Sequence, residues 1–222
     1  MNPQMKVEYI DHMGDDLTVV NAARVSFHNH STNLHEGDIR LIDYLARHNH
    51  WSPFSHCFVQ FRVQAPIFVA RQLAKHQVGL TWNEVSRRYV DTYPDFYEPE
   101  LWRGRAANNK QGSDGEIEQQ DLAHEVIRQI HQTALGTYHE LIQWGVAPEM
   151  ARMVLPQTTM TEWYWSGSLY AFSRVCKQRL DPHSQKETAE VAGWIDTHCA
   201  ELFPASWDAL LSNQQGANDN AE

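Results

Sequence analysis

The sequence predicts a single domain of the α+β class, in which helices, one of them long, flank a mixed or antiparallel sheet. Short runs that alternate apolar and polar residues, typical of strands, are separated by longer runs with apolar residues at helical spacing. A chain of 222 residues also fits one domain with a sizeable core. Its eleven glycines are scattered singly, so the chain has no Rossmann motif of the Gly-x-Gly-x-x-Gly type.

The N-terminal region predicts one strand followed by two helices. Residues 5–10 alternate and predict the strand, and residues 15–27 have helical spacing of apolar side chains. Residues 28–37 are polar and predict a loop. Asp38 is then expected to cap a helix that carries one apolar stripe.

The central region contains the clearest strand, residues 57–65, whose alternate side chains point to opposite faces. Pro66 suits the first turn of a helix, because that position has no hydrogen-bond acceptor for an N–H, and the helix is expected to extend to Lys75. Gly79 breaks it, and Asn83-Glu84 is expected to begin the next helix. The N-terminus of that helix would add partial positive charge to a ligand site.

The second half of the chain is predicted to be mainly helical. Residues 90–115 are interpreted as a surface excursion. A long helix is predicted over residues 117–144, a short one over 149–155 and a strand over 157–165. The buried stripe of the long helix is expected to consist of Ala123, Ile127, Ile130, Ala134, Tyr138 and Leu141.

Two more helices are expected to complete the domain, over residues 169–178 and 186–202. The domain is expected to extend over residues 1–213. Residues 214–222 are polar and are expected to form a disordered tail.

The composition narrows the class of protein. A formal net charge of −10 argues against nucleic acid as a partner. No apolar run approaches the roughly 20 residues that span a bilayer, and no signal-peptide core is present, so we expect a cytoplasmic protein with no membrane partner. The cysteines form neither a disulfide framework nor a zinc site, and no metal is expected. They are Cys57, Cys176 and Cys199.

Residues 71–89 concentrate basic side chains in this acidic chain, against a single acid, Glu84. A positive region of this kind suits an anionic ligand such as a phosphate. The alternative is a solvated basic helix–loop–helix. The basic residues are Arg71, Lys75, Arg87 and Arg88, and the hydrogen-bonding residues among them are Gln72, His76, Gln77, Asn83 and Ser86.

This stretch resembles the signature of the flavin-dependent thymidylate synthases, which reads Arg-His-Arg, seven or eight residues, then Ser-x-Arg-Tyr. Here Lys75-His76-Gln77 departs from the first part, whereas Ser86-Arg87-Arg88-Tyr89 preserves the second, with Asn83-Glu84 just before it. Four more segments are similar to the family. They are Ala23-Arg-Val-Ser26, His50-x-Ser-Pro-Phe-x-His56, Ala151-Arg-x-Val-Leu-Pro156 and Arg179-x-Asp-x-His-x-Gln185.

The resemblance implies the family's own fold and the reductive methylation of dUMP to dTMP. Methylenetetrahydrofolate would supply the carbon, FAD would supply the hydride and NADPH would reduce the FAD, in a homotetramer. The resemblance places Arg179 against the uracil edge, where a fixed cation favours loss of the N3 proton. Asp181 is expected to orient the guanidinium of Arg179. Arg179 and Ser86 are the expected catalytic residues.

The resemblance also implies two sets of binding residues. The nucleotide set is Gln72, Lys75, Glu84, Ser86, Arg87, Arg88, Arg152 and Arg179. The FAD set is Ser26, His50, Ser52, Lys75, His76, Gln77, Glu84, Ser168, Tyr170, Arg174 and His183. Three members of the FAD set (Ser168, Tyr170 and Arg174) differ from the residues common in the family, and Arg174 could restore the charge lost in Lys75-His76-Gln77.

Three other functions are compatible with the sequence. The first is flavin- and folate-dependent modification, such as hydroxymethylation, of another pyrimidine nucleotide. The second is a nucleotide-binding module without turnover. The third is a metal-dependent hydrolase that uses the histidine-rich segments, and its candidate ligands are His28, His30, His48, His50 and His56.

Overall fold

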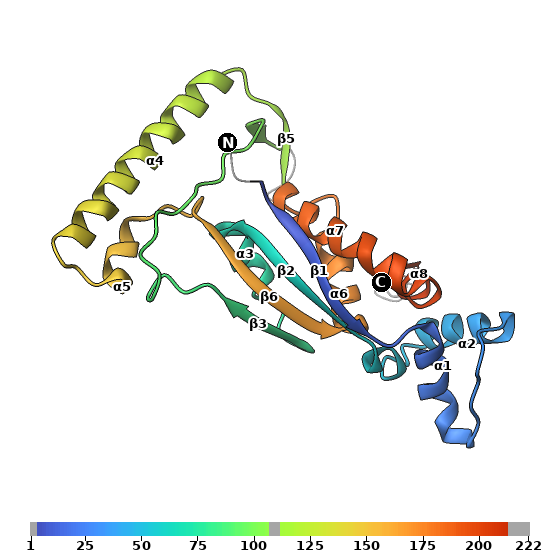
Figure 1. The fold of residues 1–222 in the computed structure, drawn as a ribbon. Coiled ribbons are helices and arrows are strands. Elements are labelled where there is room, and N and C mark those ends of the chain that lie inside the picture. The colour runs from blue at the N-terminus through green and yellow to red at the C-terminus, as the bar shows by residue number, and fades with distance from the viewer. Residues whose placement is uncertain (1–3, 107–111, 213–222) are drawn as a thin grey trace, which may run out of the picture.

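The computed structural model describes residues 4–106 and 112–212, and it confirms an α+β domain built on an antiparallel sheet. The strand order is β1-β2-β6-β3, and all neighbouring strands are antiparallel. The long pairing of β2 with β6 forms the centre of the sheet (Figure 1). The strands are β1 (Lys6–Met13), β2 (Phe58–Pro66), β3 (Leu80–Glu84) and β6 (Met160–Ser168).

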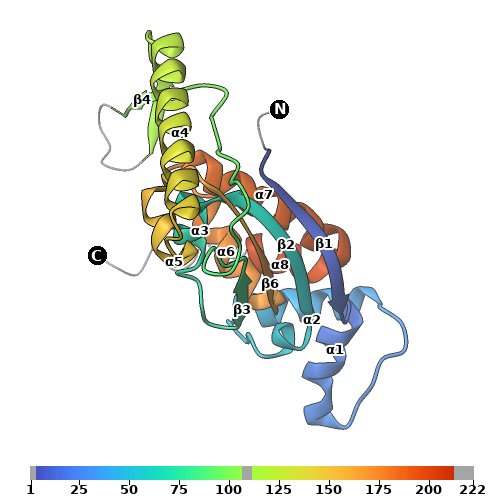
Figure 2. The same ribbon diagram turned by 60° about the vertical axis from the view of Figure 1, so that its left-hand side comes forward.

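Helices cover one face of this sheet (Figures 1 and 2). Alternate residues of β2 point towards them, so Val59 and Phe61 are buried whereas Phe58 on the open face is 44% exposed, as the alternation predicts. The helix α8 was not predicted. It packs on α2, α6 and α7, and Pro204 suits its first turn. The helices named here are α3 (Ile67–Leu73), α6 (Leu169–Arg179), α7 (Lys186–Leu202) and α8 (Pro204–Ser212).

A lobe of short helices lies at one end of the sheet (Figure 1). Asp15 caps the first of them, because its carboxylate accepts the backbone N–H of Thr18 at 2.8 Å. The lobe is formed by α1 (Asp16–Arg24), the 3-10 helix η1 (Val25–Phe27), α2 (Glu36–Arg47) and the 3-10 helix η2 (Pro53–His56).

The prediction that Asp38 caps α2 is wrong, since the helix begins two residues earlier, at Glu36. Asp38 is the third helical residue, and its carboxylate accepts the backbone N–H of His35 at 3.0 Å. This is the acidic partner of a capping box, which a single-residue cap rule does not anticipate. The same buried carboxylate forms an ion pair with Arg24.

Residues 80–84 form a strand, so the prediction of a helix start at Asn83-Glu84 is wrong. The strand β3 pairs with the exposed edge of β6, and Trp82 stacks on Trp163 with ring centroids 4.3 Å apart. Sheet pairing and aromatic stacking decide the conformation here. Residues 85–92 are also non-helical, so no helix N-terminus contributes charge at this position.

Two glycines allow β3 to begin close to α6. Gly79 has φ +78°, a conformation that glycine adopts readily, and a Cβ there would lie 3.0 Å from that of Ala171. A Cβ on Gly167 would lie 2.6 Å from the carbonyl oxygen of Gly79. The loop 74–79 is therefore held against the junction of β6 and α6.

The long helix α4 (Gln120–Gln143) stands apart from the sheet (Figures 1 and 2). Ala134 and Tyr138 of the predicted stripe are buried, whereas Ile130 is 50% exposed, so its predicted burial is wrong. His131 is buried instead, because its ring stacks on Phe96 with centroids 4.6 Å apart. The helix is followed by α5 (Pro148–Ala151) and the 3-10 helix η3 (Arg152–Val154), in place of the single short helix predicted over 149–155.

The surface excursion contains a small hairpin that was not predicted, β4 (Arg103–Arg105) with β5 (Ser113–Glu116). The expected tail, residues 214–222, lies outside the described residues. None of the described helices has the length and apolar character needed to cross a membrane.

Candidate functional site

Three predicted site residues are in direct contact, although they come from two separate regions of the sequence. Arg179, at the end of α6, donates from Nε to His76 Nε2 at 3.0 Å and from Nη2 to the carbonyl oxygen of Gln72 at 3.2 Å. Burial, together with the charges of Arg179 and Arg174, lowers the pKa of His76 to about 4. His76 is therefore neutral at pH 7 and accepts the guanidinium hydrogen bond.

Arg179 lines an open cavity of about 770 Å³. The wall contains two cations, Lys177 and Arg179, one carboxylate, Asp181, and several neutral hydrogen-bonding groups. Burial lowers the pKa of both cations. The cavity can therefore receive a polar, anionic ligand of nucleotide size. Its remaining lining residues are Gln72, Gly112, Gln178, His183, Ser184 and Gln185.

The expectation that Asp181 orients Arg179 is wrong. The carboxylate of Asp181 accepts the backbone N–H of His183 at 2.8 Å and lies 3.0 Å from its ring Nδ1. These hydrogen bonds hold the pKa of Asp181 below its usual value. Asp181 thus orients the ring of His183, and the guanidinium is held by His76 and Gln72 instead.

The second half of the signature forms a separate group after β3. Glu84 accepts hydrogen bonds from Thr161 Oγ1 at 2.8 Å and Trp82 Nε1 at 3.2 Å. Ser86 accepts the backbone N–H of Arg88 at 3.3 Å. Arg87 donates to the carbonyl oxygen of Thr92 at 2.8 Å, which closes the turn.

Arg88 is exposed, and its guanidinium donates to the hydroxyl of Tyr89 at 2.9 Å and lies 5.0 Å from the centre of that ring. Arg152 is also exposed, and its Nε donates to the carbonyl oxygen of Glu149 at 3.1 Å. Neither guanidinium contacts Arg179 or His76. Within one chain, the predicted nucleotide residues therefore lie in separate places: around Arg179, at the end of β3 with the turn after it, and on the 3-10 helix η3.

The loop that carries His50 and Ser52 meets the first turn of α6. Tyr170 donates its hydroxyl proton to Asn49 Oδ1 at 3.2 Å, and its ring lies 6.0 Å from that of Trp51. Sequence reasoning missed Asn49 and Trp51. Asn49 has φ +54°, a conformation that Asn tolerates better than most residues. In the sequence, the signals that could have identified it were its polar side chain and its position directly before His50.

The same region offers the groups that a flavin dinucleotide needs. Trp51 is 53% exposed, so its indole presents a flat apolar face. Arg174 and Lys75 are exposed cations without a carboxylate partner among the described residues, and they suit a diphosphate. Ser168 is buried and caps α6 by accepting the N–H of Ala171 at 3.2 Å, so its hydroxyl is already engaged. The residues present fit the cofactor.

Three of the predicted flavin residues lie exposed outside these contacts. Gln77 is exposed in the loop 74–79, and His183 is exposed on the cavity wall. Ser26 is exposed on η1, at the outer end of the lobe and far from α6 (Figure 1). A single chain therefore does not bring Ser26 to the other cofactor residues.

The arginines divide into two groups. Six of the thirteen are ion-paired with carboxylates: Arg24, Arg40, Arg47, Arg62, Arg103 and Arg128. The other seven have no ion pair with a carboxylate of residues 4–106 and 112–212: Arg71, Arg87, Arg88, Arg105, Arg152, Arg174 and Arg179. All of these except Arg105 lie in segments that the sequence analysis selected. In a protein of net charge −10, this distribution marks a site for anions.

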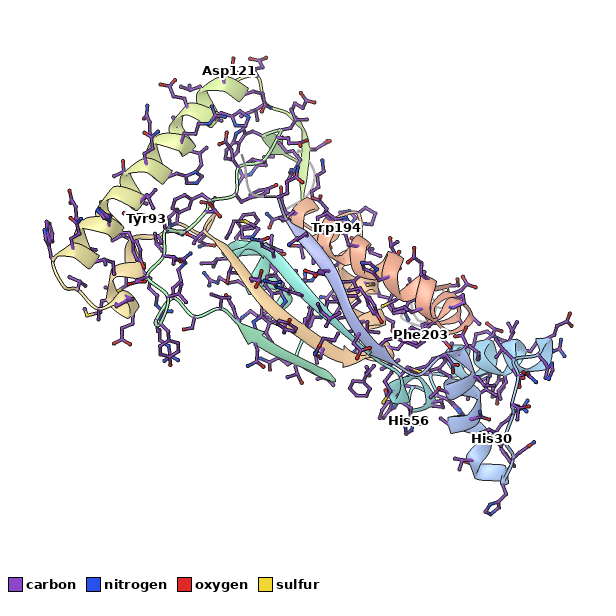
Figure 3. The ribbon with its side chains drawn as sticks, in the orientation of Figure 1. His30, His56, Tyr93, Asp121, Trp194 and Phe203 are labelled. Atoms are coloured by element: carbon purple, nitrogen blue, oxygen red, sulfur yellow. The ribbon has the colours of Figure 1, made fainter. Side chains whose placement is uncertain are left out.

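The cysteines and histidines do not form a second site. All three cysteines are buried, and burial raises the pKa of the Cys57 thiol to about 12. Figure 3 shows His30 at the outer end of the lobe and His56 at its junction with the sheet. Among the described residues, no three His, Cys, Asp or Glu side chains are grouped to hold a metal ion.

Known proteins are similar to this chain in both sequence and fold. Residues 8–205 match the family model described as thymidylate synthase complementing protein. A flavin-dependent thymidylate synthase of Thermus thermophilus is 43% identical over 205 residues, which cover 92% of this chain and 74% of the relative. Another, from Thermosipho africanus, is 37% identical over 206 residues, covering 91% of this chain and 89% of the relative.

A solved structure extends the comparison to the fold. The UMP/dUMP methylase PolB from Streptomyces cacaoi, bound with 5-Br dUMP, is 31% identical and superposes with a TM-score of 0.86 over 94% of this chain and 95% of that chain. These matches identify the chain as an enzyme of the methyltransferase class. It belongs to the flavin-dependent thymidylate synthase family, which confirms the resemblance seen in the sequence.

Proposed function

We propose that this enzyme converts dUMP into dTMP, with methylenetetrahydrofolate as the carbon donor and FAD, reduced by NADPH, as the cofactor. The observation that carries the proposal is the set of arginines without carboxylate partners, together with the hydrogen bonds that Arg179 donates to His76 and Gln72. The family membership, and the name of PolB as a UMP/dUMP methylase, support a pyrimidine nucleotide as the substrate.

Arg179 would activate the uracil. Its guanidinium is fixed by two hydrogen bonds to neutral acceptors, so its charge is not neutralised and its other N–H groups can face the cavity. A cation fixed against the ring favours the N3 anion and makes C5 electron-rich. Ser86 and the phosphate-binding arginines (Arg87, Arg88 and Arg152) would hold the nucleotide in register.

The buried cysteines support this route over covalent activation by a thiol. A thiol nucleophile must be accessible and easily ionised, whereas Cys57 has a raised pKa and is fully buried. Cys176 and Cys199 are also buried with raised thiol pKa values. The protein's part is then to bind and polarise the nucleotide, and bound FAD would supply the hydride.

The cofactor would lie along the loop 49–52 and the exposed side of α6. His50, Ser52 and Tyr170 would contact it with hydrogen-bonding groups, and Trp51 would stack on a flat ring. Arg174 and Lys75 would pair with its phosphates.

A homotetramer would complete this site. Ser26, Arg152 and the turn 86–89 are separate from the Arg179 group within one chain, so neighbouring copies would have to bring them together. Exposed apolar side chains on α4, including Val126 and Ile130, each 50% exposed, offer a surface for such contacts. Three cysteines without a disulfide support a reducing cytoplasm as its location.

The test begins with the absorption spectrum of the purified protein, where we expect a flavin band and no stoichiometric metal. NADPH should bleach that band without oxygen, and addition of dUMP with methylenetetrahydrofolate should restore it and produce dTMP. Mass spectrometry separates a methyl from a hydroxymethyl product. UMP is assayed in parallel, because PolB is named for both nucleotides. A protein that binds zinc, binds no flavin and forms no methylated product would refute the proposal.

A further inference from the structure

A chain of four side chains connects the Arg179 group to a second cavity. Arg103 Nη2 donates to Glu187 Oε1 at 2.7 Å, and Gln185 Nε2 donates to Glu187 Oε2 at 3.0 Å. Gln185 Oε1 in turn accepts a hydrogen bond from Gln72 Nε2. Glu187 lines the second cavity, of about 560 Å³, whereas Gln72 and Gln185 line the one that contains Arg179.

Glu187 is placed to control this chain. It is 4% exposed, and a buried carboxylate is tolerated where its oxygens are satisfied, here by Arg103 and Gln185. Gln185 is the N-cap residue of α7, yet its side chain makes no cap hydrogen bond and is directed to Glu187 and Gln72 instead.

The direction of every hydrogen bond follows from Glu187. A carboxylate can only accept, so Gln185 must present its NH₂ group to Glu187 and its carbonyl oxygen to Gln72. Gln72 must then donate with its own NH₂ group, which leaves its carbonyl oxygen as the group that can face the cavity. That oxygen makes no hydrogen bond within residues 4–106 and 112–212.

We propose that Glu187 is a positioning residue that fixes Gln72 as a hydrogen-bond acceptor beside the donor Arg179. The inference rests on the proposed function, because the ligand it positions is the nucleotide. Gln72 would accept a hydrogen bond from a neutral donor of dUMP, the 3′-hydroxyl, because the ring N–H is the proton that Arg179 helps to remove, while Arg179 contacts acceptor groups. The cavity would thus present two fixed groups to the ligand, the carbonyl oxygen of Gln72 as an acceptor and the guanidinium of Arg179 as a cation.

The replacement Glu187→Gln would reverse the donor–acceptor direction of the hydrogen bonds from residue 187 to Gln72. Arg103 only donates, so the new amide must turn its oxygen to Arg103 and its NH₂ group to Gln185. Gln185 and then Gln72 must rotate, and Gln72 would present an NH₂ group beside the Arg179 cation. We expect dUMP to bind about tenfold more weakly, as for one lost hydrogen bond, with the melting temperature and bound FAD little changed.

A double replacement, Glu187→Gln with Gln185→Glu, should restore Gln72 as a hydrogen-bond acceptor towards the cavity. The new amide at position 187 donates to the new carboxylate at position 185, whose other oxygen accepts from Gln72. We expect its dUMP affinity to return to within about twofold of wild type. Glu190→Gln is the matched control, because Glu190 lines the second cavity beside Glu187 and has no hydrogen bond to these four side chains in the described residues.

The measurement is the dissociation constant of dUMP by calorimetry on the FAD-bound enzyme, with dTMP formation assayed on the same samples. 2′,3′-DideoxyUMP tests the 3′-hydroxyl contact, since the Glu187→Gln effect should be lost with this ligand and its persistence would contradict the assigned contact. If Glu187→Gln does not fold, Gln185→Met interrupts the chain without changing the Arg103–Glu187 pair and should weaken dUMP binding equally.

Three outcomes would overturn the inference. If the wild type forms dTMP but Glu187→Gln binds dUMP normally, or if the double variant is no better than the single one, Glu187 has only a structural role and the proposed function stands. If the wild type neither binds nor methylates dUMP, the proposed function fails and this inference fails with it.

Discussion

Replacing Arg179 by alanine tests the chemical core of the proposed mechanism. A guanidinium within about 4 Å of the uracil would lower the pKa of N3 by about one to three units, and each unit corresponds to about 1.4 kcal/mol, or tenfold in rate. Arg179 is only partly buried, so solvent screens part of this effect. We therefore take about two units and expect dTMP formation to fall at least about a hundredfold.

The assay compares dTMP formation with NADPH oxidation at saturating dUMP. Arg179 contacts His76 and Gln72 but none of the residues assigned to FAD along the loop 49–52. Bound FAD and its reduction by NADPH should therefore persist in Arg179→Ala. The matched control is Arg105→Ala, which removes an exposed arginine that does not line this cavity and should retain activity.

A spectroscopic signature accompanies the kinetic one. The charge of Arg179 is the second cause, after burial, of the lowered pKa of His76. In Arg179→Ala that pKa should rise from about 4 towards its ordinary value, which NMR titration of the ring can follow. Near-normal dTMP formation, or an unchanged His76 titration, would refute the assignment of Arg179 as the fixed cation beside the substrate.

The remaining predictions concern other parts of the site. Replacing the three buried cysteines, Cys57, Cys176 and Cys199, by serine should leave dTMP formation intact. Lost turnover in a folded, FAD-bound variant would show that a thiol takes part. Lys75→Arg with Gln77→Arg should tighten FAD binding, measured by fluorescence quenching, because arginine adds charge and a bidentate fork; unchanged affinity would indicate that Arg174 already supplies that charge. His76 binds a proton in the unfolded but not the folded state between pH 6.5 and about 4, so stability should fall as the pH drops through this interval. His76→Asn should show a shallower fall in chemical denaturation, and an identical slope would contradict the lowered pKa.

Sequence periodicity recovered the elements whose residues are buried on one face. The alternation of residues 57–65 predicted β2 because one set of side chains packs under the helices and the other faces solvent. It failed for β3, since Asn83-Glu84 resembles a helix start and only the free edge of β6 makes the strand favourable. It also failed for Ile130, because the contact surface of α4 is set by Phe96, distant in sequence.

The candidate site shows a similar division. The motifs located Gln72, His76 and Arg179, and the fold brings them into contact across more than a hundred residues of sequence. Local reasoning assigned Asp181 to Arg179 because the two are neighbours in the chain, whereas backbone geometry turns that carboxylate to His183. Glu187 and Arg103 were missed, since a hydrogen-bond chain between separate elements leaves no pattern in sequence spacing.

The distribution of ion pairs connects stability with binding. Carboxylates outnumber basic side chains, 28 against 18, so a lack of available acids does not explain why the site arginines have no acidic partner. Unpaired cations held near one another repel, which raises the free energy of the empty site relative to a paired surface. An anionic nucleotide and a dinucleotide cofactor remove that repulsion, and because they bind only the folded chain they also stabilise it by mass action. The same arginines that weaken the empty protein therefore provide its affinity, and pairing them internally with new carboxylates would strengthen the fold while abolishing the site.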